Sequence, residues 1–194
     1  MWPLLVLSII SLSCILERLL FWFNLKKDSN ILKNYILENY RDEKNSKIFI
    51  ENLKSKEKNP YAKLTIDLLK FKIINLQEFD ELIESFLSNI DNKLNKYGTF
   101  FGLTINISPL LGLLGTVLGL MNSFAFIDIG NVGTNAKEVT GGISEALVTT
   151  AYGLIIAIFT IIFLSYFNVC RNNEMFLIEA FSYKLRASYF KNLR

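Results

Sequence analysis

Three long apolar tracts dominate the pattern of hydrophobic and polar positions along this chain of 194 residues. They cover residues 1–23, 99–127 and 142–169. About 20 consecutive apolar residues form a helix long enough to cross a bilayer, so each tract predicts one transmembrane helix. The charged residues gather in the segment 24–98 and in the tail 170–194. The predicted fold is an all-α integral membrane protein with three transmembrane helices and long helical extensions outside the bilayer.

The first tract, WPLLVLSIISLSCILERLLFWF, admits a second interpretation as a cleaved signal peptide. No basic stretch precedes it and no small-residue cleavage site follows it, which favours a true span. Trp2 and Trp22 lie twenty residues apart, about 30 Å along a helix, and this separation predicts that they occupy the two interfacial belts. Glu17 and Arg18 are expected to extend to the cytoplasmic headgroups.

The distribution of basic residues predicts the orientation of the spans. Fourteen Lys or Arg lie between Lys26 and Lys96 and five lie in the tail from Arg171, whereas the loop 128–141 contains Lys137 alone. Loops rich in Lys and Arg stay in the cytoplasm. Residues 24–98 are therefore predicted to be a cytoplasmic helical segment and residues 170–194 a cytoplasmic helical tail. The N-terminus and the loop 128–141 are predicted on the outer, periplasmic side.

The cytoplasmic segment has several helix signals. Asn59 followed by Pro60 is typical of a helix start, and Asn75 with Glu78 has the spacing of a capping box. Apolar residues then recur at intervals of three and four, as on one face of a helix: Leu76, Phe79, Ile83, Phe86, Ile90, Leu94 and Tyr97. Nothing stronger than Gly98 interrupts this pattern, so one long helix is expected to continue into the second span. Residues 24–58 have weaker periodicity and predict shorter helices.

The two inner spans each have a face of small residues. These are Ser108, Gly112, Gly115 and Gly119 in the second span, and Ala146, Thr150, Gly153, Ala157 and Thr160 in the third. Small residues let helix backbones approach closely in lipid, so Gly112, Gly115, Gly119 and Gly153 are candidate helix-packing positions. Ordinary bundle packing is one explanation. The second explanation is assembly of several chains, because a single three-span chain is not expected to provide packing partners for both small-residue faces.

Polar side chains in these spans are candidates for a functional path. Charged residues within a membrane usually face a bundle interior or a water-filled cavity. Thr116 and Thr150 both lie about 12 Å below the outer ends of their spans, counted at the rise of a helix. Glu145 lies higher and shares its helix face with Thr149 rather than Thr150. One of these two faces is expected to line a central path and the other to contact a neighbouring helix.

Several classes of function lack support in the sequence. The chain has no His, and no group of Cys and carboxylates at metal-ligand spacing. Phosphate-binding glycine loops and nucleophile elbows are absent, so neither a cofactor nor an enzymatic activity is expected. The net charge of +3 does not favour nucleic acid as a partner. Cys14 and Cys170 lie in or beside apolar tracts that are expected to end on opposite sides of the bilayer, so no disulfide between them is expected.

Two motifs resemble a known family. NISPLLGLLGTVLGLMNSF together with GGISEALVTTAYGLIIAI resembles the paired signature of the MotA/TolQ/ExbB proton-channel family, on its ExbB/TolQ side. The opening MWPLLVLSIISLSCILERL is similar to the first span of many ExbB-like members. The resemblance implies a homo-oligomeric ring of roughly five chains joined by heterologous contacts. It also implies pore-lining roles for Thr116, Glu145 and Thr150.

The function implied by this resemblance is that of an inner-membrane proton-channel subunit. Such a subunit surrounds a single-span ExbD- or TolR-like partner and couples the proton motive force to a TonB- or TolA-like protein that works at the outer membrane. The proton-carrying Asp would belong to the partner, so Thr116 and Thr150 would line that carboxylate. Glu145 would tune the outer mouth of the path or pair with a neighbouring chain. Two alternatives stay open, a non-conducting membrane scaffold and a MotA-like stator of another motor, although three spans count against the latter.

Overall fold

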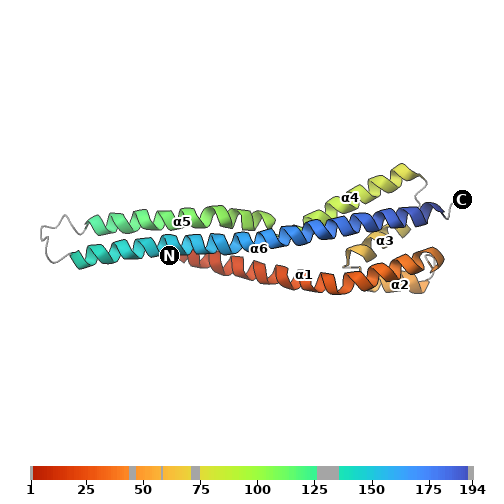
Figure 1. Ribbon diagram of the computed structural model, residues 1–194, viewed down its shortest axis with the longest axis horizontal. Helices are drawn as coiled ribbons and strands as arrows, with labels where there is room; N and C mark the ends of the chain where they lie inside the picture. Colours follow the sequence, from red (N-terminus) through yellow and green to blue (C-terminus); the bar gives the residue numbers. More distant parts are fainter. Residues whose placement is uncertain (1, 44–46, 58, 71–74, 126–135, 192–194) are drawn as a thin grey trace. The chain divides into compact units, whose positions relative to one another are not determined.

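The protein is described by a computed structural model that covers residues 2–43, 47–57, 59–70, 75–125 and 136–191 (Figure 1). Over these residues the regular elements are helices: α1 (Trp2–Glu43), α2 (Lys47–Ser55), α3 (Pro60–Lys70), α4 (Leu76–Leu94), α5 (Gly98–Ala125) and α6 (Ala136–Lys191). Three of them, α1, α5 and α6, are long and apolar enough to cross a membrane. The prediction of an all-α chain with three membrane-spanning helices is confirmed. The greater part of the predicted loop 128–141, residues 128–135, lies outside the described residues.

The chain divides into two compact units. The first, called the apolar unit here, consists of Met1–Glu17 and Tyr97–Phe167. The second, called the charged unit, consists of Arg18–Lys96 and Asn168–Arg194. The long helices α1 and α6 contribute to both units, whereas α5 belongs to the apolar unit and α2, α3 and α4 belong to the charged unit.

The apolar unit is built in the manner of a membrane bundle. Large apolar side chains such as Leu110 and Ile155 are exposed on its outside. Its buried side chains are mostly small or carry hydroxyl groups: Ser11, Thr104, Ser108, Ser123, Ala146, Thr149, Ala157 and Thr160. Small residues let the backbones come close, and close packing rather than hydrophobicity holds helices together in lipid.

The charged unit has the aromatic and aliphatic core of a water-soluble bundle. Its fully buried side chains come from every helix of the unit and include Ile36, Phe49, Tyr61, Leu64, Phe79, Ile178 and Phe181. Tyr61 of α3 packs edge-on against Phe181 of α6, with ring centroids 5.0 Å apart. Burial of such side chains stabilises a fold by about 1.5–3 kcal/mol each, so this core is a main source of the unit's stability.

The predicted helix starts in the charged unit are confirmed. The Asn59 side chain accepts the backbone N–H of Tyr61 at 3.1 Å, with Pro60 as the first residue of α3. The Asn75 side chain accepts the backbone N–H of Glu78 at 2.8 Å and caps α4. Each cap satisfies one of the N–H groups that the first turn of a helix leaves without a partner.

Two expectations about helix lengths were wrong. α1 continues from the first span to Glu43 as one helix, where shorter helices were expected from residue 24 onward. The long helix expected across residues 76–127 is interrupted, because α4 ends at Leu94 and α5 begins at Gly98. Between them Tyr97 has a φ of 67°, in the left-handed region. Gly usually takes that position at a helix end, and here the glycine comes one residue later.

The end of the first tract also differs from expectation. Trp22 is only 2% exposed and packs against Phe21, with ring centroids 5.6 Å apart, instead of facing the headgroups. Arg18 is 3% exposed and therefore does not extend to the surface. Both residues belong to the charged unit. Their environment is the interior of that unit rather than the lipid interface.

Candidate functional site

Helices α5 and α6 of the apolar unit run side by side (Figure 1), and the polar candidates of the inner spans lie in and around their contact. This contact is close because glycines face it. A methyl group added at Gly153 would lie 2.5 Å from the Ser108 carbonyl oxygen, and one added at Gly119 would lie 2.6 Å from Cβ of Ala146. Neither position has room for a larger side chain. The backbones of the two helices therefore touch along much of their length.

The small-residue faces of α5 and α6 pack against each other within one chain. Besides the contacts of Gly119 and Gly153, Gly112 faces the Thr150 backbone and Gly115 faces the Thr149 side chain. The expectation that these faces need several chains to be satisfied is wrong. The physical reason is that antiparallel neighbours in sequence can supply each other with the close packing that small residues allow.

Thr150 and Thr149 use their hydroxyl groups differently. Thr150 Oγ1 donates across the contact to the carbonyl oxygen of Gly112 at 2.9 Å. Thr149 is 5% exposed, and its Oγ1 donates within α6 to the carbonyl oxygen of Glu145 at 3.0 Å. Thr150 therefore links the two helices by a hydrogen bond, whereas Thr149 fills space against Gly115.

Thr116 lies beside this contact at nearly the same depth as Thr150. Gly115 faces Thr149 across antiparallel helices, so Thr116 and Thr150 differ in depth by about 3 Å, twice the rise per residue. Thr116 is half-buried, and its Oγ1 donates to the carbonyl oxygen of Leu113 at 2.7 Å. The hydroxyl proton is thus engaged within its own helix.

Glu145 has an exposed side chain, although it stands one residue before Ala146, which packs on Gly119. The structure therefore brings Gly112, Gly115, Gly119, Gly153 and Thr150 together in one contact. It places Thr116 at the margin of that contact and Glu145 outside it.

A link between α1 and α6 was missed by the sequence analysis. Ser11 Oγ and Thr160 Oγ1 lie 3.2 Å apart, both buried. They border a cavity of about 210 Å³ that is also lined by Ser8, Leu12, Ile155, Ile156 and Phe159. The spacing of small residues singled out Thr160, but nothing in the sequence identified Ser11 as its partner.

No group of three or more His, Cys, Asp or Glu side chains that could hold a metal ion occurs among the residues that the structure describes. The polar groups described at the site are the carboxylate of Glu145 and the hydroxyl groups of Thr116, Thr149 and Thr150. Such groups can bind water and exchange protons.

Comparisons with known proteins place this arrangement in context. Residues 41–180 match the model of a family described as the MotA/TolQ/ExbB proton channel family. Over 178 residues the chain is 38% identical to the putative biopolymer transport protein ExbB-like 3 of Synechocystis, covering 91% of this chain and 84% of that protein. Identity to ExbB-like 1 of the same organism is 29% over 165 residues, covering 84% and 64%. A stretch of 52 residues is 54% identical to the biopolymer transport protein ExbB of Salmonella typhimurium, covering 27% and 21%.

Proposed function

Because this chain belongs to the MotA/TolQ/ExbB proton channel family and is a multi-pass membrane protein of the ExbB type, we propose that it is the ring-forming subunit of a proton-driven machine in the bacterial inner membrane. About five copies would enclose an ExbD- or TolR-like single-span partner. Proton flow would then drive a TonB- or TolA-like protein that acts at the outer membrane. The N-terminus would be periplasmic and the C-terminus cytoplasmic.

The observation that carries this proposal is the exposed carboxylate of Glu145 on an apolar helix. A charged side chain facing lipid is unfavourable, by about 2.5–3.5 kcal/mol at the middle of a membrane and by less near its edge, so such groups normally face protein or water. Since the small-residue faces are already satisfied within the chain, Glu145 is the stronger argument for assembly. Neighbouring chains around a central path would give this carboxylate a hydrated environment.

The hydroxyl oxygens of Thr116 and Thr150 can each accept a hydrogen bond. Each hydroxyl donates its single hydrogen to a backbone carbonyl, of Leu113 and of Gly112 respectively. A hydroxyl group whose hydrogen is engaged still has lone pairs to accept with. Both side chains can therefore receive a hydrogen bond from water or from a protonated carboxylic acid of the partner. This is the role that a proton path requires at these positions.

The driving force is sufficient for mechanical work. One elementary charge that crosses a potential of 100 mV releases about 2.3 kcal/mol. Several protons per step would supply enough free energy to rotate or shift a ring around its partner. The acceptor hydroxyls would hold the protonated partner carboxyl at a fixed depth during each step.

The experiment removes each hydroxyl group while preserving the shape of the side chain. We expect Thr116→Val and Thr150→Val to abolish proton-driven envelope function, measured in cells, while the oligomer persists in native mass spectrometry. Thr150→Ser retains the bond to Gly112 and should keep most activity. Thr149→Val is the matched control, because Thr149 is buried against Gly115 and its hydroxyl cannot reach water or a partner, and it should be silent.

Glu145→Gln tests the carboxylate in the same assay and is expected to impair activity. If Thr116→Val, Thr150→Val and Glu145→Gln all assemble and all support wild-type function, the proton-path proposal is wrong. The non-conducting scaffold would then be the better interpretation. Assembly of the chain with a rotary motor instead of an outer-membrane system would favour the MotA-like alternative.

A further inference from the structure

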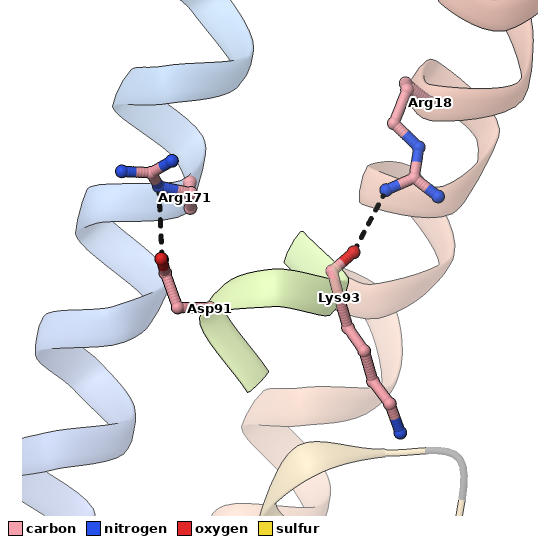
Figure 2. Close-up of polar contacts among 4 residues, drawn as sticks. All are labelled: Arg18, Asp91, Lys93 and Arg171. Atoms are coloured by element: carbon pink, nitrogen blue, oxygen red, sulfur yellow. Dashed lines mark hydrogen bonds and ion pairs between the residues drawn. The ribbon is translucent and has the colours of Figure 1, made fainter. Parts of the chain in front are cut away.

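The last turn of α4 is held by arginines from two other helices of the charged unit (Figure 2). Arg18 of α1 donates from Nη1 to the carbonyl oxygen of Lys93 at 3.4 Å. Arg171 of α6 places Nε 3.3 Å from Oδ1 of Asp91. Figure 2 shows the two guanidinium groups reaching this turn from separate helices.

Arg18 is the more deeply buried of the two, at 3% exposed. Its guanidinium lies over the ring of Phe21, 4.4 Å from the centroid. A buried cation is unfavourable unless its surroundings compensate the charge. The end of a helix does so, because its last carbonyl groups carry the negative end of the helix dipole. The Lys93 carbonyl oxygen also accepts the backbone N–H of Lys96 at 3.4 Å, and its second lone pair accepts the hydrogen bond from Arg18. Arg18 is therefore matched to the C-terminus of α4 in both charge and hydrogen bonding.

Arg171 makes a weaker contact. Its side chain is 27% exposed and that of Asp91 is 40% exposed, so water screens the pair. Nε lies within ion-pair distance of the carboxylate but lacks the geometry of a hydrogen bond. This second contact orients the turn from the side of α6, and the main restraint comes from Arg18.

The end of α4 needs a restraint because the local sequence favours a helix that continues past Leu94. The apolar spacing continues from Leu76 to Tyr97 without a break and would extend the helix. The structure instead ends α4 at Leu94 and places Tyr97 in the left-handed region, at a φ of 67°. A bulky residue rarely adopts this conformation unless its surroundings impose it. Disagreement between local preference and observed structure is characteristic of strained or functional positions.

We propose that Arg18 and Arg171 are positioning residues that hold the last turn of α4 in place and so fix the point at which this helix ends. Three residues, 95–97, separate that end from Gly98, the first residue of α5, which is the helix that carries Thr116. The inference rests on the proposed function only for its activity measurement. The conformation of the turn is measured separately.

The experiment uses the full chain assembled in lipid nanodiscs and measures hydrogen exchange of the backbone amides of Leu94, Asn95 and Lys96. Arg18→Met keeps an unbranched apolar stem against Phe21 but removes the charge and the donors. It is expected to speed exchange at these amides about tenfold, the range of a charge at a helix terminus. Arg18→Lys retains the charge and should keep most of the protection. Thr116→Val is the matched control and should leave exchange unchanged.

Swapping the two charges tests the contact between Arg171 and Asp91. Arg171→Asp alone should speed exchange less than Arg18→Met, and combining it with Asp91→Arg should restore protection. These partly exposed positions also carry the test if Arg18→Met fails to assemble. The proposal is overturned if Arg18→Met assembles and its hydrogen exchange is unchanged, or if Arg18→Lys loses as much protection as Arg18→Met. It is also overturned if Arg171→Asp combined with Asp91→Arg does not recover the protection that Arg171→Asp loses.

Proton-driven activity is then measured for the same variants. Arg18→Met should reduce it and Arg18→Lys should retain it, in proportion to the exchange result. If Thr116→Val keeps full activity, the proposed function loses support, while the exchange measurement still decides whether the arginines hold the turn. The two failures are therefore distinguishable.

Discussion

Glu174, on α6 in the charged unit, is a carboxyl group in the interior of a bundle, at 6% exposed. It accepts a hydrogen bond from the Tyr61 hydroxyl at 3.0 Å. Burial raises the pKa of Glu174, and the bond from Tyr61 together with Lys33 and Lys26 of α1 opposes this rise. Burial and the nearby carboxylate also raise the pKa of Tyr61, so the phenol stays protonated and remains the donor.

This buried carboxyl predicts how the stability of the charged unit depends on pH. Because its folded-state pKa is raised, the folded state binds a proton that the unfolded state has released, and stability falls as pH rises from about 4.3 through the folded pKa. Glu174→Gln keeps an acceptor for Tyr61 and removes this loss. We expect the variant to gain stability relative to wild type at pH 8 and to gain less at pH 4.5, measured by thermal unfolding in detergent. The exposed Glu81→Gln is the control, and an equal shift at both pH values for Glu174→Gln would contradict the prediction.

Single residues were predictable where the cause is local. The caps at Asn59 and Asn75 depend on neighbours two or three positions away, so the sequence contains all the information needed. The partner of Glu174 lies 113 positions away in the chain and the partner of Arg18 lies 75 away. Nothing in a sequence pattern identifies such pairs, because they depend on how the helices are packed. For the same reason the expectation that Arg18 would reach the headgroups was wrong.

Among the elements, the pair α5 and α6 shows how glycine positions determine the distance between helices. Gly153 meets the backbone of α5 at Ser108 and Gly112, whereas Gly141, in the same helix, has no atom within 4 Å of an added methyl group. The same residue type therefore has a packing role at one position and none at the other. Periodicity alone marked Gly153 as a packing position, but it did not show which helix would fill the space.

Gly153→Ala is expected to destabilise the apolar unit by about 1–3 kcal/mol, because the added methyl group forces the helices apart. Gly141→Ala should be neutral or stabilising by up to about 1 kcal/mol, since alanine favours a helix and meets no neighbour there. Unfolding of both variants in a graded series of denaturing detergent provides the measurement. Equal stability of the two variants would show that the α5–α6 contact is looser than described.

Element boundaries were the part of the fold that sequence patterns predicted least well. The three spans follow from apolar length, which is a property of each segment by itself. The end of α4 depends on Arg18 and Arg171, which are distant in sequence. The uninterrupted length of α1 is also a tertiary effect, because buried residues such as Ile36 and Tyr40 anchor its second half in the charged unit.

On the scale of the whole molecule, the two units have opposite interiors. The apolar unit buries hydroxyl groups and exposes leucine and isoleucine, whereas the charged unit buries phenylalanine, tyrosine and leucine. The first arrangement suits lipid as the surrounding medium and the second suits water. This contrast agrees with the distribution of basic residues, which predicts that the charged unit lies in the cytoplasm.

The orientation of the chain in the membrane can be tested with single cysteines at two exposed positions, Gly141 and Asn89. After Cys14 and Cys170 are replaced by Ala, Gly141→Cys should react with a membrane-impermeant thiol reagent added to spheroplasts, and Asn89→Cys should react only after lysis. The reason is that the positive-inside rule places residue 141 outside and residue 89 inside. Reaction in the reverse order would overturn the orientation and, with it, the depth assigned to Thr116 and Thr150.

Trp22 gives the protein an optical probe of its own. The chain has two tryptophans, of which Trp2 is 81% exposed and Trp22 is 2% exposed. The indole N–H of Trp22 has no hydrogen-bond partner among the described residues, although buried tryptophans usually find one. A buried indole fluoresces at a shorter wavelength than one exposed to water, and its emission shifts to the red when water reaches it. With Trp2 replaced by phenylalanine, the emission colour of an unlabelled, working protein would therefore report whether the interior one helical turn from Arg18 stays closed.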